Sequence, residues 1–272
     1  MGDEMREADI PSIHGDQHAT GPVTAVALDY ADGHQVPSHS HQRAQLLYAV
    51  RGVLVVGTAG GLWVVPDNRG LWVPAGVEHW TRMVGEVRVR TLYIEPDSAP
   101  HLPTACTVLA ISPLLRELIL AAVGIAGEVP ADSRDGRVLR LLLDELTSEP
   151  ALPLHLPLPN EPRLRRLCRD MGLDAGLEDW AARAKVDAKT VRRWFLRDTG
   201  LTFGQWRQQA RLLRALELLG SGASVLEAAL EVGYSTPSAF SAMFSRQFGR
   251  PPSDFLRPPR ETSGNRPRSS GN

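Results

Sequence analysis

The fold of the second half of the chain is decided by residues 224–244, which read SVLEAALEVGYSTPSAFSAMF. Small apolar residues recur at helical spacing in its first part, at Val225, Ala228, Ala229 and Val232. Gly233 can take the left-handed conformation that ends a helix. Thr236 suits the cap of a following helix, and Pro237 suits its first turn. Since Phe240 and Phe244 pack one face of that second helix, the stretch predicts a helix-turn-helix, which places its second helix in the major groove of DNA.

A second unit of the same kind is predicted upstream. Residues 177–184 form a short amphipathic helix, residues 185–187 form the turn with Asp187 as the cap, and residues 188–196 form the second helix. Val191 and Phe195 face the core. The polar side chains left for solvent or phosphate are Lys189, Thr190, Arg192 and Arg193. A long helix over 202–219, capped by Thr202, connects the two units.

Two helix-turn-helix units joined by a long helix resemble the DNA-binding domain of the AraC/XylS family of transcription regulators. The matching segments are GLTF at 200–203, RLLRA at 211–215, AA at 228–229, VGY at 232–234, Phe240, Phe244 and FGRPP at 248–252. The resemblance implies contacts to double-stranded operator DNA from Ala188, Lys189, Thr190, Arg192, Arg193, Thr236, Pro237, Ser238, Ser241 and Arg246. It also implies RNA polymerase as a partner.

The chain departs from the family pattern at three positions. The second recognition helix has Ala242 and Ser245 where family members often carry Arg or Lys, so we expect the first recognition helix to dominate affinity. Lys185 stands in the first turn, where Gly is frequent.

The charge of the chain is unevenly distributed. Residues 160–272 carry 19 Lys and Arg against 12 Asp and Glu, a net charge of +7, whereas residues 1–159 carry 11 against 19, a net charge of −8. All eight His lie in the acidic part. A basic part beside an acidic part fits a DNA-binding domain joined to a domain of another kind.

The first hundred residues read as short strands punctuated by Gly, Pro, Asn and Asp. We expect strands over 23–30, 45–50, 53–57, 62–65, 71–73 and 87–94, with hairpin turns at Gly60–Gly61 and Asp67–Asn68. Many short strands at close spacing predict a sandwich or barrel. The fold class is therefore α+β and multidomain: an N-terminal β-barrel and an all-α C-terminal domain.

A patterned run inside this region resembles the two signature motifs of cupins, the small jelly-roll barrels. It runs through Gly33, His39, His41, Gln45 and Gly52, and a later segment ends at His79. In metal-binding cupins the ligands at these positions are three histidines and a glutamate, so the resemblance implies His39, His41, Gln45 and His79 here. Gln45 replaces the glutamate, and a neutral amide is a weaker ligand for a divalent metal. The sequence does not require a cofactor. The four side chains form either a divalent-metal site or a hydrogen-bonding pocket for a small-molecule effector. The absence of the glutamate charge at Gln45 favours the pocket.

The segment 101–159 connects the two domains. It predicts one helix over 112–123, capped by Ser112, and a second helix over 135–147. The two helices either cover the barrel or pair with their copies in a homodimer, and the family resemblance favours the homodimer. A proline-spaced linker follows at 149–159. The expected units are a sensor barrel at 1–100, this segment, a DNA-binding domain at 160–258 and a disordered tail at 259–272.

We expect a cytoplasmic protein, since no apolar run approaches the length of a membrane span and no signal peptide precedes the barrel. Cys106 and Cys168 show no paired spacing, which fits reduced thiols.

Three functions are open at this point. The first is a transcription regulator that responds to an effector in its barrel, the second is a metal-dependent dioxygenase or isomerase, and the third is an architectural DNA-binding protein with an unliganded barrel. The basic double motif and the absence of other clustered acids or bases argue against an enzyme. The sequence therefore predicts a sequence-specific DNA-binding regulator.

Overall fold

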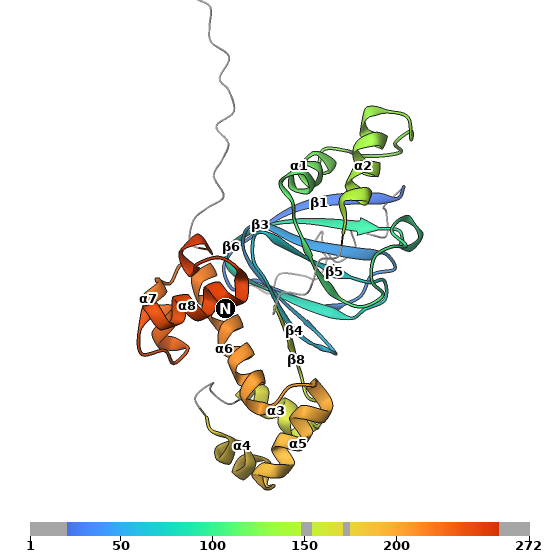
Figure 1. Ribbon diagram of the computed structural model, residues 1–272. Helices are drawn as coiled ribbons and strands as arrows, with labels where there is room; N and C mark the ends of the chain where they lie inside the picture. The colour runs from blue at the N-terminus through green and yellow to red at the C-terminus, as the bar shows by residue number, and fades with distance from the viewer. Residues whose placement is uncertain (1–20, 148–153, 171–174, 256–272) are drawn as a thin grey trace, which may run out of the picture.

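The computed structural model describes residues 21–147, 154–170 and 175–255. Its N-terminal domain is an antiparallel sheet, as the sequence predicts, and Figure 1 shows it beside a helical C-terminal domain. The strands are β1 (Val23–Tyr30), β2 (Gln35–His39), β3 (Ala44–Thr58), β4 (Gly61–Val65), β5 (Arg69–Val73), β6 (His79–Ile94), β7 (Thr107–Ala110) and β8 (His155–Pro157). β7 and β8 were not expected from the sequence.

The two long strands fold the sheet over on itself. β3 pairs with β6 along its length, and its register shifts between Ala49 and Val53. Gly52 and Gly85 adopt positive φ values at this bend, which a side chain would strain. One half of the sheet adds β1, β5 and β7, and the other adds β2, β4 and β8. Side chains from both halves line one small interior cavity, so the halves face each other as a barrel.

Two helices cover the outer face of the first half of the sheet (Figure 1). In α1 (Pro113–Ala122), the Ser112 hydroxyl accepts a hydrogen bond from the Leu115 backbone N–H, as predicted for a cap. In α2 (Arg134–Glu145), the cap is Ser133, so this helix begins slightly before the predicted residue 135. Their apolar stripes pack on Leu46, Trp72 and other outward-facing residues of the sheet.

The C-terminal domain contains the two predicted helix-turn-helix units. Its helices are α3 (Pro162–Asp170), α4 (Leu177–Ala184), α5 (Ala188–Thr199), α6 (Phe203–Gly220), α7 (Val225–Glu231) and α8 (Pro237–Phe248). Short 3-10 helices stand at Pro96–Ser98 and Pro252–Phe255. The hydroxyl or carboxylate of each predicted cap, Asp187, Thr202 and Thr236, accepts a backbone N–H of its helix, and Gly233 has a φ of 83°. The turn between α4 and α5 is carried by Lys185 at a φ of 56°.

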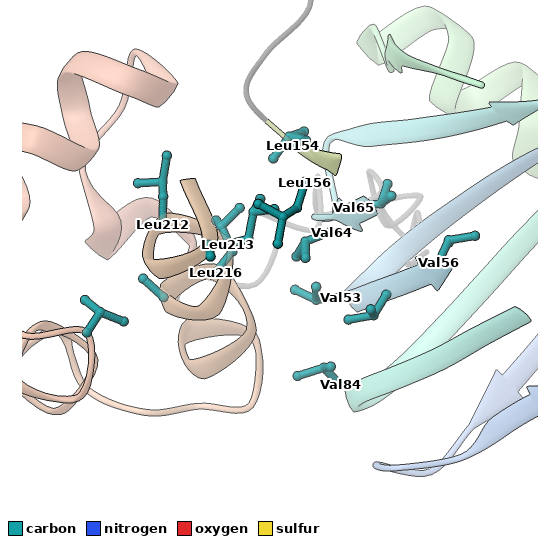
Figure 2. Close-up of a cluster of buried hydrophobic side chains, with 14 of the residues drawn as sticks. Val53, Val56, Val64, Val65, Val84, Leu154, Leu156, Leu212, Leu213 and Leu216 are labelled. Carbon is teal, nitrogen blue, oxygen red and sulfur yellow. The ribbon is translucent and has the colours of Figure 1, made fainter. Parts of the chain in front are cut away.

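The long helix α6 lies against the barrel as well as between the two helix-turn-helix units. Figure 2 shows Leu213 and Leu216 turned toward Leu156 of β8 and Val64 of β4. The approach is so close at the end of α6 that a Cβ on Gly220 would lie 2.3 Å from a methyl carbon of Val53. One apolar cluster therefore runs from the barrel interior through this contact into the helical domain.

The end of the predicted linker is part of this contact. Residues 155–157 form β8, which pairs with β4, and residues 149–153 lie outside the described residues. The Trp206 indole N–H donates to the Pro157 carbonyl at 2.8 Å, and the Gln209 amide donates to the His155 carbonyl at 3.2 Å. This part of the linker is thus docked between the domains. The tail at 259–272 also lies outside the described residues.

Candidate functional site

The three predicted histidines meet inside the barrel. His39 ends β2, His79 begins β6 directly opposite it, and His41 follows β2 in the connection to β3. Ligating nitrogens of the three rings lie within 4.8 Å of one another. His41, His79 and the fourth predicted residue, Gln45 of β3, are buried. The structure therefore brings together all four residues that the sequence singled out.

Backbone carbonyls fix the orientation of two of the rings. The Nδ1 atom of His39 lies 2.7 Å from the Pro37 carbonyl oxygen, and that of His79 lies 2.9 Å from the Val77 carbonyl oxygen. A carbonyl only accepts, so each Nδ1 carries the proton and each Nε2 of a neutral ring presents a lone pair. Holding the ring by its distal N–H in this way is typical of metal-ligating histidines.

The amide of Gln45 is oriented by a hydrogen-bond chain. The Thr91 hydroxyl donates its single proton to the Leu46 carbonyl at 3.1 Å, so it must accept from the Gln45 amide nitrogen at 3.0 Å. The Gln45 oxygen is thereby directed at Nε2 of His79, also at 3.0 Å.

Two acceptors then face each other, the Gln45 oxygen and the His79 Nε2 lone pair. A second proton on the His79 ring would turn Nε2 into a donor to the Gln45 oxygen. However, burial lowers the pKa of His79 to about 4, so the doubly protonated ring is disfavoured at neutral pH. A cation bound to both atoms would satisfy the two lone pairs without protonation of the ring. Three imidazole nitrogens and an amide oxygen suit Zn²⁺, Ni²⁺, Cu²⁺ or Fe²⁺, so the residues fit a divalent metal.

The cavity beside the histidines is small. Its volume is about 30 Å³, and its walls include Leu47, Leu54, Met83 and Tyr93. Pockets for organic ligands are typically about 300–1,000 Å³, whereas one or two water molecules need a few tens of Å³. The interior as it stands has room for an ion and its immediate ligands, but not for an organic ligand of ordinary size.

Three tryptophans and a glutamate close to the histidine motif in sequence lie away from this cavity. Trp72 packs under α1 and α2, Trp80 covers Gly57, and Trp63 stacks on His155 at a centroid distance of 3.9 Å. Glu78 accepts a hydrogen bond from the Ser38 hydroxyl at the surface.

The predicted DNA-contacting residues lie on α5 and α8. Lys189, Arg192 and Arg193 are exposed, Ala188 and Thr190 are half-buried, and among the described residues none of the three cations forms an ion pair. In the second unit, the N-terminal end of α8 carries Thr236, Pro237, Ser238 and Ser241, and Arg246 lies exposed in the last turn. The α5 surface is the more basic of the two.

Comparison with known proteins agrees with both halves of this description. Residues 180–258 match the model of a helix-turn-helix domain, and residues 21–184 match the model of an AraC-like ligand binding domain. The chain belongs to the AraC family of transcription regulators. It is 32% identical over 256 residues to the HTH-type transcriptional regulator NimR of Escherichia coli K12, covering 93% of each chain. It is also 32% identical over 120 residues to the regulator RipA of Corynebacterium glutamicum, covering 43% of this chain and 35% of RipA.

Among solved structures, a ToxT structure from Vibrio cholerae aligns over 87% of this AraC-family chain and 97% of its own, at 10% identity and a TM-score of 0.37. Family membership confirms the predicted fold class and the regulator assignment, and it excludes the enzyme alternative. Within the described ranges, no helix combines the length and the apolar character needed to cross a bilayer.

Proposed function

We propose that this AraC-family regulator binds one asymmetric operator with α5 and α8 in successive major grooves, and holds a divalent metal in its barrel through His39, His41, His79 and Gln45. The observation that carries the metal proposal is the 3.0 Å approach of the Gln45 oxygen to Nε2 of His79, two acceptors that a shared cation would satisfy. When bound, the ion supplies a charge that pulls these side chains together. An organic effector inside the barrel is the weaker candidate, because the cavity is about 30 Å³.

The DNA proposal rests on repetition and on charge. Both units begin their second helix with a cap, and α6 holds them at a fixed separation. Exposed Lys189, Arg192 and Arg193 can contact phosphates or bases, and arginine is the usual reader of guanine. We expect contacts about one helical turn apart on the same face of the duplex.

Metal binding can reach the DNA-binding domain through strand β6. Successive side chains of a strand point to opposite faces. Thr81 and Met83 line the histidine cavity, and Arg82 between them points outward, where its guanidinium donates to the Glu217 carboxylate of α6 at 2.9 Å. A shift of β6 caused by ligation of His79 would therefore move a direct partner of the helix that spaces the two recognition helices.

The proposal includes a homodimer and a contact with RNA polymerase. Leu114 of α1 is 48% exposed and Leu141 of α2 is 42% exposed, so the two covering helices leave apolar side chains for a second copy. The polymerase contact rests on the family alone.

Equilibrium dialysis of the chelator-treated full chain against Zn²⁺, followed by elemental analysis, tests the metal proposal. We expect about one ion per chain, loss of that ion in His79→Ala, and weakened binding in Gln45→Leu, which keeps the size and removes the oxygen. His101→Ala is the matched control, since His101 lies outside the cluster and donates to the Leu146 carbonyl. An unmodified chain that takes up no stoichiometric divalent metal refutes this part of the proposal.

Selection of DNA from a random pool by the purified chain, followed by footprinting, tests the DNA proposal separately. A single asymmetric site with two protected major-groove segments is expected. No retention of any duplex at low salt would contradict it.

A further inference from the structure

A second and much larger cavity lies outside the barrel, between the first strand and the two covering helices. Its volume is about 460 Å³, which is in the range of pockets that bind organic molecules. Its walls are residues 21–25, which lead into β1 and begin it, the loop 123–131 after α1, and one face of α2. Among the described residues, none lines both this cavity and the histidine cavity.

The lining of this cavity is apolar with one cation. The apolar side chains are Val23, Val123, Ile125, Val129, Leu139 and Leu143. Among the residues that the structure describes, Arg140 is the only charged residue of the lining. Arg140 is exposed at the rim of the cavity, where its guanidinium donates to the carbonyl of another lining residue, Ala131, at 2.6 Å. Within the described part of the chain it forms no ion pair.

We propose that this cavity binds a small amphipathic organic anion, a carboxylate with an apolar tail. The tail is buried among the apolar side chains, and each buried methylene favours binding through the hydrophobic effect. The carboxylate takes the remaining N–H donors of Arg140, which prefer a planar anion over a hydroxyl. Such a ligand bridges β1 and α2, so it fixes the helical cover against the barrel. The site is independent of the metal proposal.

Decanoate and decan-1-ol are suitable probes because they share one tail and differ in charge. Calorimetric titration of the full chain is expected to give one decanoate site per chain, with a dissociation constant on the order of 10–100 µM. Decan-1-ol is expected to bind about fivefold more weakly, since it cannot form the charge-assisted pair.

Two variants with matched controls locate the site. Ala126→Trp fills the cavity from its exposed rim and is expected to weaken decanoate at least about tenfold, whereas Ala121→Trp, on an exposed position of α1 outside the lining, leaves affinity unchanged. Arg140→Gln is expected to remove the preference for decanoate over decan-1-ol, and Arg137→Gln on the same helix retains it.

Two results overturn the proposal. The first is no saturable binding of either probe by the full chain, whether or not a chain shortened to begin at Gly21 binds. The second is binding that Ala126→Trp leaves intact.

Discussion

Gly220→Ala is expected to destabilise the chain by forcing α6 away from the barrel. The new Cβ would lie 2.3 Å from one Cγ of Val53 and 2.9 Å from its Cβ, whereas ordinary contact begins near 3.4 Å. Val53 is buried in β3 and β-branched, so it has few rotamers with which to give way. Overpacking of this kind costs about 1–3 kcal/mol. Ala returns about 0.5 kcal/mol of helix propensity at the last residue of a helix, so the free energy of unfolding should fall by about 0.5–2.5 kcal/mol.

Urea unfolding followed by circular dichroism measures this loss. The control is Gly204→Ala in the first turn of the same helix, where no atom lies within 4 Å of the new Cβ. That variant is expected to be unchanged or more stable by up to about 1 kcal/mol. Adding Val53→Ala to Gly220→Ala should make room and recover part of the loss. Equal behaviour of the two glycine variants would refute the close packing of α6 on the barrel.

Further predictions concern the turn, the histidines and the recognition helices. Lys185→Gly should raise the free energy of unfolding by about 0.5 kcal/mol, because glycine adopts the left-handed backbone conformation of this residue without strain, whereas Lys185→Ala should not raise it. Equal free energies of unfolding for the two variants would contradict this. Between about pH 6.5 and pH 4, the metal-free chain should lose up to about 3 kcal/mol, because the unfolded His79 ring takes up a proton near pH 6.5 and the folded ring only near a pKa of about 4. His79→Gln should flatten that titration, and an unchanged slope would exclude this origin. Arg192→Ala should weaken operator binding by about 1–3 kcal/mol, and Ser241→Ala should weaken it by less. Fluorescence anisotropy measures both losses, with Arg134→Ala as the control. A larger loss in Ser241→Ala would contradict the dominance of α5.

The helical half of the fold was predictable because its signals are local. Asp187, Thr202 and Thr236 each cap the helix that their position predicted, and Gly233 ends α7 as expected. Caps and helical periodicity depend on residues within one or two turns, so a sequence reveals them directly.

The sheet was only partly predictable because strand pairing is not local. The sequence predicts a break between two strands at Gly52, whereas β3 continues through the bend there. β8 was part of a proline-spaced linker, and only its pairing with β4 makes it a strand. The docking of α6 had one overlooked signal: Leu213 is an apolar position outside the stripe of Leu212, Ala215, Leu216 and Leu219.

For the barrel site, the sequence supplied the four residues and the structure changed their interpretation. The loss of the glutamate charge at Gln45 favoured an organic pocket. The orientation of the Gln45 amide depends on Thr91, 46 residues away, and on the Leu46 carbonyl, which no local pattern could reveal. The direction of the oxygen at His79 and the cavity volume of about 30 Å³ are the two observations that support our proposal of a metal.

The most direct test of this account is the operator affinity of the full chain with and without metal in the barrel. Fluorescence anisotropy would compare chelator-treated chain with the same chain carrying one equivalent of Zn²⁺. We expect the dissociation constant for the operator to change at least about fivefold, the lower end of typical coupling between two sites, and we expect His79→Ala to abolish the change. Identical affinities in the two states, with Zn²⁺ shown to be bound, would contradict the proposal that the barrel metal controls the DNA-binding helices.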